Sequence, residues 1–350
     1  MALLTTTIGA YPKPACVPIP DWFRAKGGPD TDRPTAGYLA ALAEMGEEAE
    51  ARFAEGTREV IEDQVEAGID IPTDGEIRRE NYIHYHCRHL EGFDFDRLTA
   101  KEVRGGTYKA ELPSITGDVG VRDHFLAHDW RVAQGFTDRP VKITMPGPMT
   151  ITDTTANLHY DDERALGADL AEALNAEILD LAAAGCTWIQ VDEPVFARKP
   201  RAALDYGIEN LNRCFAGVPG GVTRVMHMCC GYPDRLDRED YPKAEREAYG
   251  QLAAAVDQAD LDAVSLEDAH RHNDLSLLER FADKSVILGV VAIAKSRVEP
   301  VEEIRSRLTA ALDHIDAERL IAAPDCGLGL LGRNLARQKL QNLCEAARAV

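Results

Sequence analysis

The sequence lacks a hydrophobic run long enough to cross a membrane. Its longest apolar stretch, from about Ser285 to Ala294, is about half the length of a membrane span. The first residues, Met1 to Thr5, also lack the basic segment and apolar core that mark a secretory signal peptide. We therefore expect a protein that neither enters a membrane nor is exported.

Positive charge is scarce as well. The chain carries 39 Lys and Arg residues against 59 Asp and Glu residues, which gives a formal net charge of -20 at pH 7. Nucleic acids and anionic membranes bind basic surfaces, so we expect neither as a main partner. Basic residues could still hold a small anion locally, such as an anionic thiol or a folate tail, and five lie near predicted strand ends: Lys13, Arg78, Arg79, Lys295 and Arg297. For any one of them, an ordinary surface charge is the default interpretation.

Cysteines are few and unevenly spaced. Eight in a chain of 350 residues do not form the pattern of a disulfide framework. We therefore predict free or metal-bound thiols in a reducing cytoplasm. The hydrophobic content of 45% and the charged content of 28% are those of a globular protein with a large core.

Strand-like runs and helical patterns alternate along most of the chain. Beyond residue 140 we predict strands at 141–145, 188–191, 222–228, 263–266, 286–291 and 320–323, each followed by a helix. Two further strands are predicted at 3–8 and 69–71, the second after a long helix over 37–67. Eight such units in this order predict an α/β fold, a (β/α)8 TIM barrel that forms a single domain over residues 1–350.

The alternation is lost between residues 77 and 140, where the sequence is polar, aromatic and glycine-containing. We interpret this segment as an insertion after strand two, a small β-hairpin and a helix that cover the active-site mouth. An open doubly wound sheet is the structural alternative, and it needs a phosphate-binding glycine fingerprint after an early strand. Gly27-Gly28 and Gly105-Gly106 lack that spacing, which favours the barrel.

Metal-binding residue types follow three of the predicted strands. His227 and Cys229 are two residues apart, so a strand directs both side chains to one face. Glu267 and Cys326 follow two other strands, and the C-terminal ends of barrel strands meet at one mouth. One nitrogen, one carboxylate and two thiolates suit tetrahedral zinc, with the carboxylate as the weakest ligand. A thiol bound to zinc is deprotonated and nucleophilic at neutral pH, which implies alkyl transfer to sulfur.

Two carboxylates end strands two and four. Glu76 and Asp192 are either solvated loop residues and helix caps, or a pair that holds the ammonium group of a substrate. We favour the pair because both strand ends face the same mouth. Cys230 should point away from the metal. The segment from His84 to His89, which includes Cys87, has no second anchoring segment, so we interpret it as structural or as part of the mouth.

The strand ends together resemble those of the cobalamin-independent methionine synthase family, in its catalytic half. The similarity extends along the whole chain. It depends on six motifs, which are Ile8-Gly9-Ala10-Tyr11-Pro12, Asp74-Gly75-Glu76, Pro146-Gly147-Pro148, Gln190-Val191-Asp192-Glu193-Pro194, His227-Met228-Cys229 and Pro324-Asp325-Cys326-Gly327.

The resemblance implies a zinc-bearing (β/α)8 barrel that activates the thiolate of homocysteine and methylates it, with a methyltetrahydrofolate as donor, to give methionine. The implied zinc ligands are His227, Cys229, Glu267 and Cys326. The amino group of homocysteine would be held by Glu76 and Asp192, and its carboxylate would meet backbone amides at Ile8 and Ala10.

Three departures from the family pattern concern the substrates. The chain lacks the family's second, N-terminal barrel, which helps to bind a polyglutamyl folate. Ala10 replaces a serine, and Ala292-Ile293-Ala294 replaces an Asp-x-His motif that supplies an acid. The methyl donor is therefore either a methyltetrahydrofolate or a methyl-corrinoid protein, which would act as a methyl carrier.

Two alternatives stay open: alkyl transfer to another thiol, as in epoxyalkane:coenzyme M transferases, and a non-catalytic zinc-binding barrel.

Overall fold

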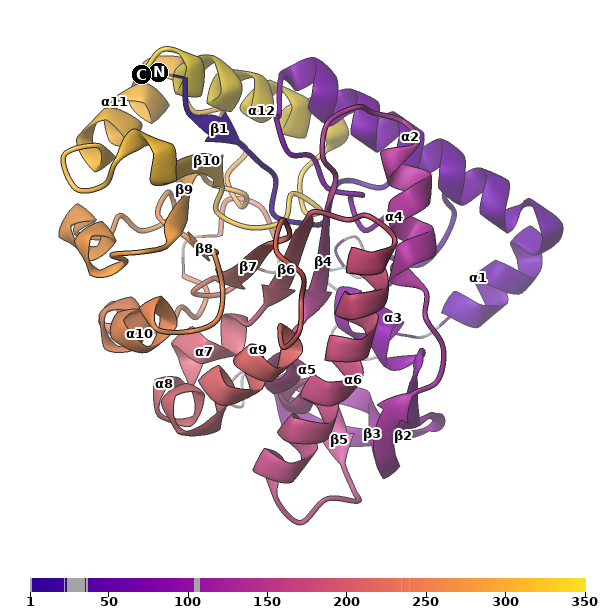
Figure 1. Ribbon diagram of the computed structural model, residues 1–350. Helices are drawn as coiled ribbons and strands as arrows, with labels where there is room; N and C mark the ends of the chain where they lie inside the picture. The colour runs from indigo at the N-terminus through magenta and orange to yellow at the C-terminus, as the bar shows by residue number, and fades with distance from the viewer. Residues whose placement is uncertain are drawn as a thin grey trace.

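The computed structural model describes residues 2–21, 23, 35, 37–103, 108–233, 235–238 and 240–350 (Figure 1). Gly27, Gly28, Gly105 and Gly106 lie outside these described residues. A seven-stranded parallel sheet forms the centre, in the order β1-β10-β9-β8-β7-β6-β4. Its strands are β1 (Leu4–Thr5), β4 (Lys142–Pro146), β6 (Trp188–Asp192), β7 (Thr223–Met228), β8 (Ala263–Leu266), β9 (Ser285–Val291) and β10 (Leu320–Pro324).

The segment of residues 69–73 closes this sheet into a barrel. Parallel bridges join Thr6 to Ile71 and Thr73 to Lys142, so the segment lies between β1 and β4. The amide of Ile71 donates to the carbonyl of Thr5 at 3.0 Å, and the amide of Lys142 donates to the carbonyl of Pro72 at 2.8 Å. The predicted α/β barrel is confirmed, and the doubly wound alternative is wrong. The strands predicted at 3–8 and 69–71 are shorter than expected, because only β1 and isolated bridges form there.

Helices cover the outside of the barrel (Figure 1). Those after the barrel strands are α5 (Pro148–Asp153), α6 (Glu163–Ala183), α7 (Pro194–Arg198), α8 (Pro200–Ala202), the π-helical η2 (Ala203–Gly207), α9 (Ile208–Cys214), α10 (Ala248–Asp257), α11 (Val301–Ala311) and α12 (Arg333–Arg348). The segment after β8 is a 3₁₀ helix, η3 (Leu275–Arg280), and a further 3₁₀ turn, η4 (Ala317–Arg319), precedes β10. None of the helices in the described ranges is both long and apolar enough to span a bilayer.

The long helix predicted over 37–67 is interrupted. It consists of α1 (Tyr38–Met45), the 3₁₀ turn η1 (Gly46–Glu48) and α2 (Ala49–Ala67). Gly46 has a φ of 53°, a left-handed value that ends α1 and that glycine adopts without a steric penalty. Gly68, with a φ of 106°, ends α2 in the same way.

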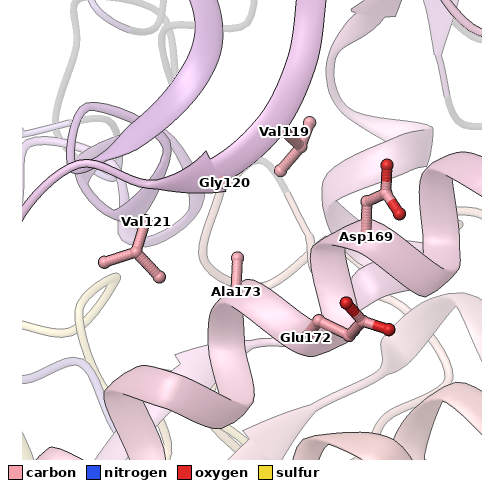
Figure 2. A pocket seen from close by; sticks show the side chains of 6 residues that line it. All are labelled: Val119, Gly120, Val121, Asp169, Glu172 and Ala173. Carbon is pink, nitrogen blue, oxygen red and sulfur yellow. The ribbon is translucent and has the colours of Figure 1, made fainter.

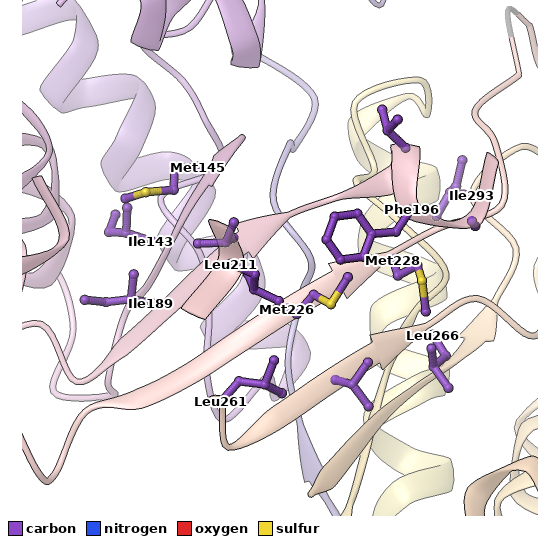
Figure 3. Close-up of a cluster of buried hydrophobic side chains, with 14 of the residues drawn as sticks. Ile143, Met145, Ile189, Phe196, Leu211, Met226, Met228, Leu261, Leu266 and Ile293 are labelled. Atoms are coloured by element: carbon purple, nitrogen blue, oxygen red, sulfur yellow. The ribbon is translucent and has the colours of Figure 1, made fainter. Parts of the chain in front are cut away.

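Alternate residues of each strand face two different apolar environments. Inside the barrel, Val225, Ala263, Ile287 and Ile321 pack together with Ile8. On the outer side of the strands, buried residues such as Ile143, Met145 and Ile189 join a larger cluster with Leu211 of α9 and Phe196 of α7 (Figure 3). A strand period of two therefore places Gln190 and Asp192 on the inner face, next to the outward-facing Ile189 and Val191.

The region of residues 77–140 contains α3 (Tyr82–Cys87), β2 (Leu90–Val103), β3 (Tyr108–Val121) and α4 (Leu126–Gln134). Strands β2 and β3 form an antiparallel hairpin, which is longer than the small hairpin predicted, and β3 also pairs with β5 (Ala156–Asn157). A pocket between β3 and α6 is lined by Val119, Gly120, Val121, Asp169, Glu172 and Ala173 (Figure 2). None of these residues ends a barrel strand. That the insertion covers the mouth stays a prediction, as does the single domain.

A buried ion pair fastens the outer helix α12 to the loop after β9. Lys339 is fully buried and donates to Glu299 at 2.7 Å and to the carbonyl of Ala292 at 3.1 Å. Removing one member of such a pair leaves an uncompensated buried charge. We expect Lys339→Met to lower the free energy of unfolding by about 3 kcal/mol, measured by urea denaturation. Arg305→Gln, which breaks an exposed pair with Glu302, is the matched control and should leave stability unchanged. Equal effects of the two changes would contradict this account.

Candidate metal and substrate site

Three predicted ligands meet at the C-terminal ends of two strands. His227 and Cys229 come from the end of β7, and Cys326 follows β10. One ligand atom from each lies within 4.8 Å of the other two, and Cys326 Sγ is 3.4 Å from His227 Nε2. The other ring nitrogen, His227 Nδ1, lies 2.9 Å from Ser265 Oγ on β8. This contact directs Nε2 towards the two thiols, in the way that neighbouring groups orient metal-binding histidines.

The charges of this group favour a thiolate. The hydrogen bond with Cys326 holds the pKa of Cys229 well below its usual range, and His227 acts in the same direction against the effect of burial. Burial alone would lower the pKa of His227, but the hydrogen bond and charge of Cys229 outweigh it and raise that pKa. A thiolate next to an imidazole, with a second thiol beside them, is a soft donor set of the kind that zinc accepts.

Glu267 follows β8 but lies outside this three-residue group. Its ligand atom belongs to a second group, with His270 and Asp325, in which the ligand atoms also lie within 4.8 Å. Glu267 accepts hydrogen bonds from the amide of Cys230 at 3.0 Å and from Lys243 Nζ at 3.1 Å. Burial raises its pKa, and the charge of Cys229 contributes to the increase. Its role as the fourth ligand therefore stays a prediction.

Asp325 has a different task from its neighbour Cys326. Its carboxylate accepts hydrogen bonds from the amides of Asp268, Ala269 and His270, at 3.0, 2.8 and 2.7 Å. His270 Nδ1 is also 2.7 Å from Asp325. These bonds tie the loop after β8 to the end of β10, so Asp325 orients both ligand-bearing segments. Nothing in the sequence singled out His270, because it follows Glu267 in a loop without periodicity.

Glu76 and Asp192 are both buried at the mouth of the same barrel. Glu76 accepts a hydrogen bond from Thr144 Oγ1 at 2.8 Å and lies 3.4 Å from Arg79. Its φ of 57° is left-handed, which is rare for a residue other than glycine and is common at functional sites. Burial raises the pKa of Asp192 to about 7, and the charge of Glu76 adds to this increase. Glu76 thus raises the free energy of the charged form of Asp192, and a substrate cation would offset this effect.

Ile8 and Ala10 follow β1 and are also buried. The carbonyl of Ile8 accepts a hydrogen bond from Gln190 Nε2, and that of Ala10 accepts one from the amide of Leu328. Among the described residues, none accepts a hydrogen bond from the amide of Ile8 or Ala10. Gly327 lies close by, since a Cβ at that position would be 3.1 Å from the amide nitrogen of Ala10.

Most of the basic residues noted in the sequence are paired with carboxylates. Lys13 pairs with Asp21, Arg78 with Glu50 and Asp129, Arg79 with Asp74 and Glu76, and Arg297 with Glu303. Arg198, at the end of α7, was not singled out in the sequence. It pairs with Asp153, and its charge adds to the lowering of the Cys229 pKa by Cys326 and His227.

Tyr82, a residue of the insertion, interacts electrostatically with the metal-binding group. Burial raises the pKa of Tyr82 in α3 well above its usual value, and the charges of Asp192, Cys229 and Cys326 raise it further. The histidines that follow have no comparable contact with the site. His84 Nε2 lies 3.0 Å from the carbonyl of Thr154, and His86 Nδ1 lies 2.7 Å from the carbonyl of Tyr82. These contacts agree with the structural interpretation of this segment.

Gly9 permits the close approach of Glu76. A Cβ at position 9 would lie 2.6 Å from Glu76 Oε1, which is held by Thr144. We expect Gly9→Ala to displace this carboxylate and to lower stability by about 1–3 kcal/mol, measured by a crystal structure and by urea denaturation. Gly332→Ala is the matched control, because nothing lies within 4 Å of a Cβ there. An unmoved Glu76 in the Gly9→Ala structure would refute this expectation.

Comparisons with known proteins agree with this geometry. Residues 3–349 match the family described as the catalytic domain of cobalamin-independent synthase. The chain is 30% identical over 352 residues to a methionine synthase of Saccharolobus solfataricus, covering 99% of this chain and 95% of that protein. It is 30% identical over 343 residues to a methionine synthase of Sulfolobus acidocaldarius, covering 97% and 90%.

A solved structure has the same fold over its full length. It is a B12-independent methionine synthase from a Shewanella species in complex with selenomethionine, with a TM-score of 0.88, 30% identity, and coverage of 100% of this chain and 98% of that one. The match covers the strand ends that carry the three-residue metal-binding group and both buried carboxylates. The chain therefore belongs to the cobalamin-independent methionine synthase family, a family of methyltransferases.

Proposed function

We propose that the protein transfers a methyl group to the thiol of homocysteine and so forms methionine, with zinc as its cofactor. The observation that carries this proposal is the convergence of His227, Cys229 and Cys326 at the same barrel mouth as Asp192 and Glu76. A thiol and an ammonium group on one small molecule match these two halves of the site. The solved relative that is in complex with selenomethionine supports the choice of amino acid.

The donor set fits zinc better than a harder cation. We assign His227, Cys229 and Cys326 as ligands, and Glu267 as a fourth ligand that moves from its bonds to Cys230 and Lys243. When bound, the metal would lower the pKa of a coordinated thiol and leave its sulfur nucleophilic at neutral pH. All eight cysteines, each within the described part of the chain, are free, which supports the proposed cytoplasmic location.

The side chains around the metal group would bind and orient the substrate. Asp192 and Glu76 accept hydrogen bonds from the ammonium group, and the amides of Ile8 and Ala10 donate to the carboxylate. Holding both the ammonium and the carboxylate group fixes the position of the sulfur. This contribution to the rate comes from orienting the sulfur towards the methyl donor, not from making the sulfur more reactive. Burial of the site excludes water, which strengthens each of these charged contacts.

The reaction forms a carbon–sulfur bond and breaks the bond between the methyl group and its donor, while the thiol proton is released. The donor is a methyltetrahydrofolate or a methyl-corrinoid protein. Ala292 and Ala294 provide no proton donor at the end of β9. The corrinoid is the better fit to this feature, because its cobalt leaves with the bonding electrons and needs no proton, whereas the folate nitrogen does.

A different acceptor thiol is the second candidate, as in epoxyalkane:coenzyme M transferases. Ala10, in place of the family's serine, favours a thiol without an amino acid end. However, four of the five basic residues near strand ends, all except Lys295, are already paired with carboxylates. The buried carboxylates Glu76 and Asp192 suit an ammonium group and would repel a sulfonate. Homocysteine is therefore preferred over a sulfonate thiol.

Loss of one thiolate should abolish metal binding and activity together. We expect Cys326→Ser to reduce the zinc content by at least about tenfold and to abolish methionine formation, measured by metal analysis and with both donor types. Cys344→Ser is the matched control, since Cys344 is a buried cysteine on α12 away from the site. A Cys326→Ser protein that keeps its zinc would contradict the ligand assignment, and wild-type protein that forms no methionine with either donor would contradict the proposed reaction.

The ionisation of Asp192 should govern substrate affinity. Its pKa is raised to about 7 by burial, so the fraction of ionised carboxylate falls as the pH drops below that value. Only the ionised form attracts an ammonium group, so homocysteine affinity should fall from about pH 8 to about pH 6, by up to about tenfold per unit below the pKa. Calorimetric titration measures this. 4-Mercaptobutyrate, which lacks the amino group, controls for thiol ionisation, and a parallel loss for both ligands would count against the role of Asp192.

A further inference from the structure

Gln190 joins two parts of the substrate site that lie far apart in the sequence. It is fully buried in the middle of β6. Its Nε2 donates to the carbonyl of Ile8 at 2.7 Å and to Asp192 Oδ1 at 2.7 Å. Ile8 and Gln190 are separated by 182 residues. Strands β1 and β6 are not neighbours in the sheet, so this bond crosses the inside of the barrel.

The orientation of this amide is fixed by its partners. Both Ile8 O and Asp192 Oδ1 are acceptors, so the atom between them must be the NH₂ group and not the amide oxygen. The two hydrogens of one planar NH₂ group point in set directions. The position of the Asp192 carboxylate is therefore tied to that of the backbone at Ile8.

Packing alone does not explain a glutamine here. Gln190 Oε1 is buried, and none of the described residues donates a hydrogen bond to it. An unpaired buried amide oxygen is unfavourable, and an aliphatic side chain of similar size would fill the space without it. The strand partner of Gln190 on β7, Val225, belongs to the apolar cluster inside the barrel, so an aliphatic side chain would suit this position. The donor group of Gln190 is the feature that contacts the site.

We propose that Gln190 is a positioning residue, which sets the distance between the group that binds the substrate's ammonium (Asp192) and the amides that bind its carboxylate (Ile8 and Ala10). The inference rests on the proposed function, since those roles belong to it. The consequence is cooperative recognition. An amino acid whose ammonium and carboxylate groups match this distance should gain more binding free energy than the sum of the two separate contacts.

A set of four thiols measures this cooperativity. Homocysteine carries both end groups, 4-mercaptobutyrate lacks the amino group, 3-aminopropanethiol lacks the carboxylate, and propanethiol lacks both. Dissociation constants from calorimetry with zinc-loaded protein give the gain in affinity, relative to propanethiol, from each end group alone and from the two together. In the wild-type protein we expect homocysteine to bind roughly tenfold more tightly than the separate gains predict.

Gln190→Met should remove this tenfold excess, while each separate gain changes by less than about twofold. Gln190→Leu, which also lacks the NH₂ donor and adds no charge, should do the same and serves if the first variant does not fold. Gln134→Met is the matched control. The NH₂ group of Gln134, at the end of α4, also joins two acceptors, the carbonyls of Thr137 and Arg139 ahead of β4, so its loss should lower stability but keep the excess.

The outcomes separate the inference from the function on which it rests. Wild-type protein that binds homocysteine no better than propanethiol overturns the proposed amino acid site. Wild-type protein with the excess, together with a folded, zinc-loaded Gln190 variant that keeps it, overturns the role of Gln190 alone. Loss of the excess in the Gln190 variants, and not in Gln134→Met, supports the inference.

Discussion

The closure of the parallel sheet is the constraint on which the site depends. Residues 69–73 join β1 to β4 through two bridges, so the C-terminal ends of all barrel strands converge on one mouth. His227 and Cys326 are 99 residues apart in the chain, yet their ligand atoms are 3.4 Å apart. The hydrogen bonds of Asp325 then fix the loop after β8 against β10, so that the ligand-bearing ends are held by the backbone as well as by side chains.

The site contains several buried charges, and each is explained by a partner or by an expected ligand. Asp325 is satisfied by backbone amides, and Glu267 by Lys243 and the amide of Cys230. Asp192 and Glu76 are different, because burial raises the pKa of each, and a neighbouring carboxylate adds to the increase: Glu76 for Asp192, and Asp74 for Glu76. A buried carboxylate with too few partners is unfavourable in a protein interior. A cationic substrate that supplies the missing partner should therefore bind strongly.

The sequence predicted the fold well where strands are continuous and apolar. The six barrel strands beyond residue 140 begin and end within one residue of the prediction, because a parallel sheet buried on both sides produces a continuous apolar run. The two-residue strand β5, which lies in the other sheet, was not predicted. The closing segment around Ile71 was harder, since its pairing consists of isolated bridges. The break at Gly46 was missed because the apolar period continues through it, and only the positive φ reveals the turn.

Site residues were predictable where residue type and strand position agree, as for His227, Cys229 and Cys326. Glu267 was expected to join them, but its observed partners are the amide of Cys230 and the side chain of Lys243. These partners come from other parts of the chain, so the sequence alone does not reveal that they compete with the metal for this carboxylate. Arg198, Tyr82 and His270 were not singled out, because each reaches the site from a helix or loop whose course the sequence does not specify. The sequence left the basic residues near strand ends as either anion-binding groups or ordinary surface charges, and the structure pairs most of them with carboxylates.

Zinc-edge X-ray absorption on the purified protein tests the central claim most directly, that His227, Cys229 and Cys326 bind one metal ion with Glu267. The account predicts a first shell of two sulfurs and two lighter atoms, with a third sulfur replacing one lighter atom when homocysteine is added. A shell without sulfur, or one that homocysteine leaves unchanged, would contradict it.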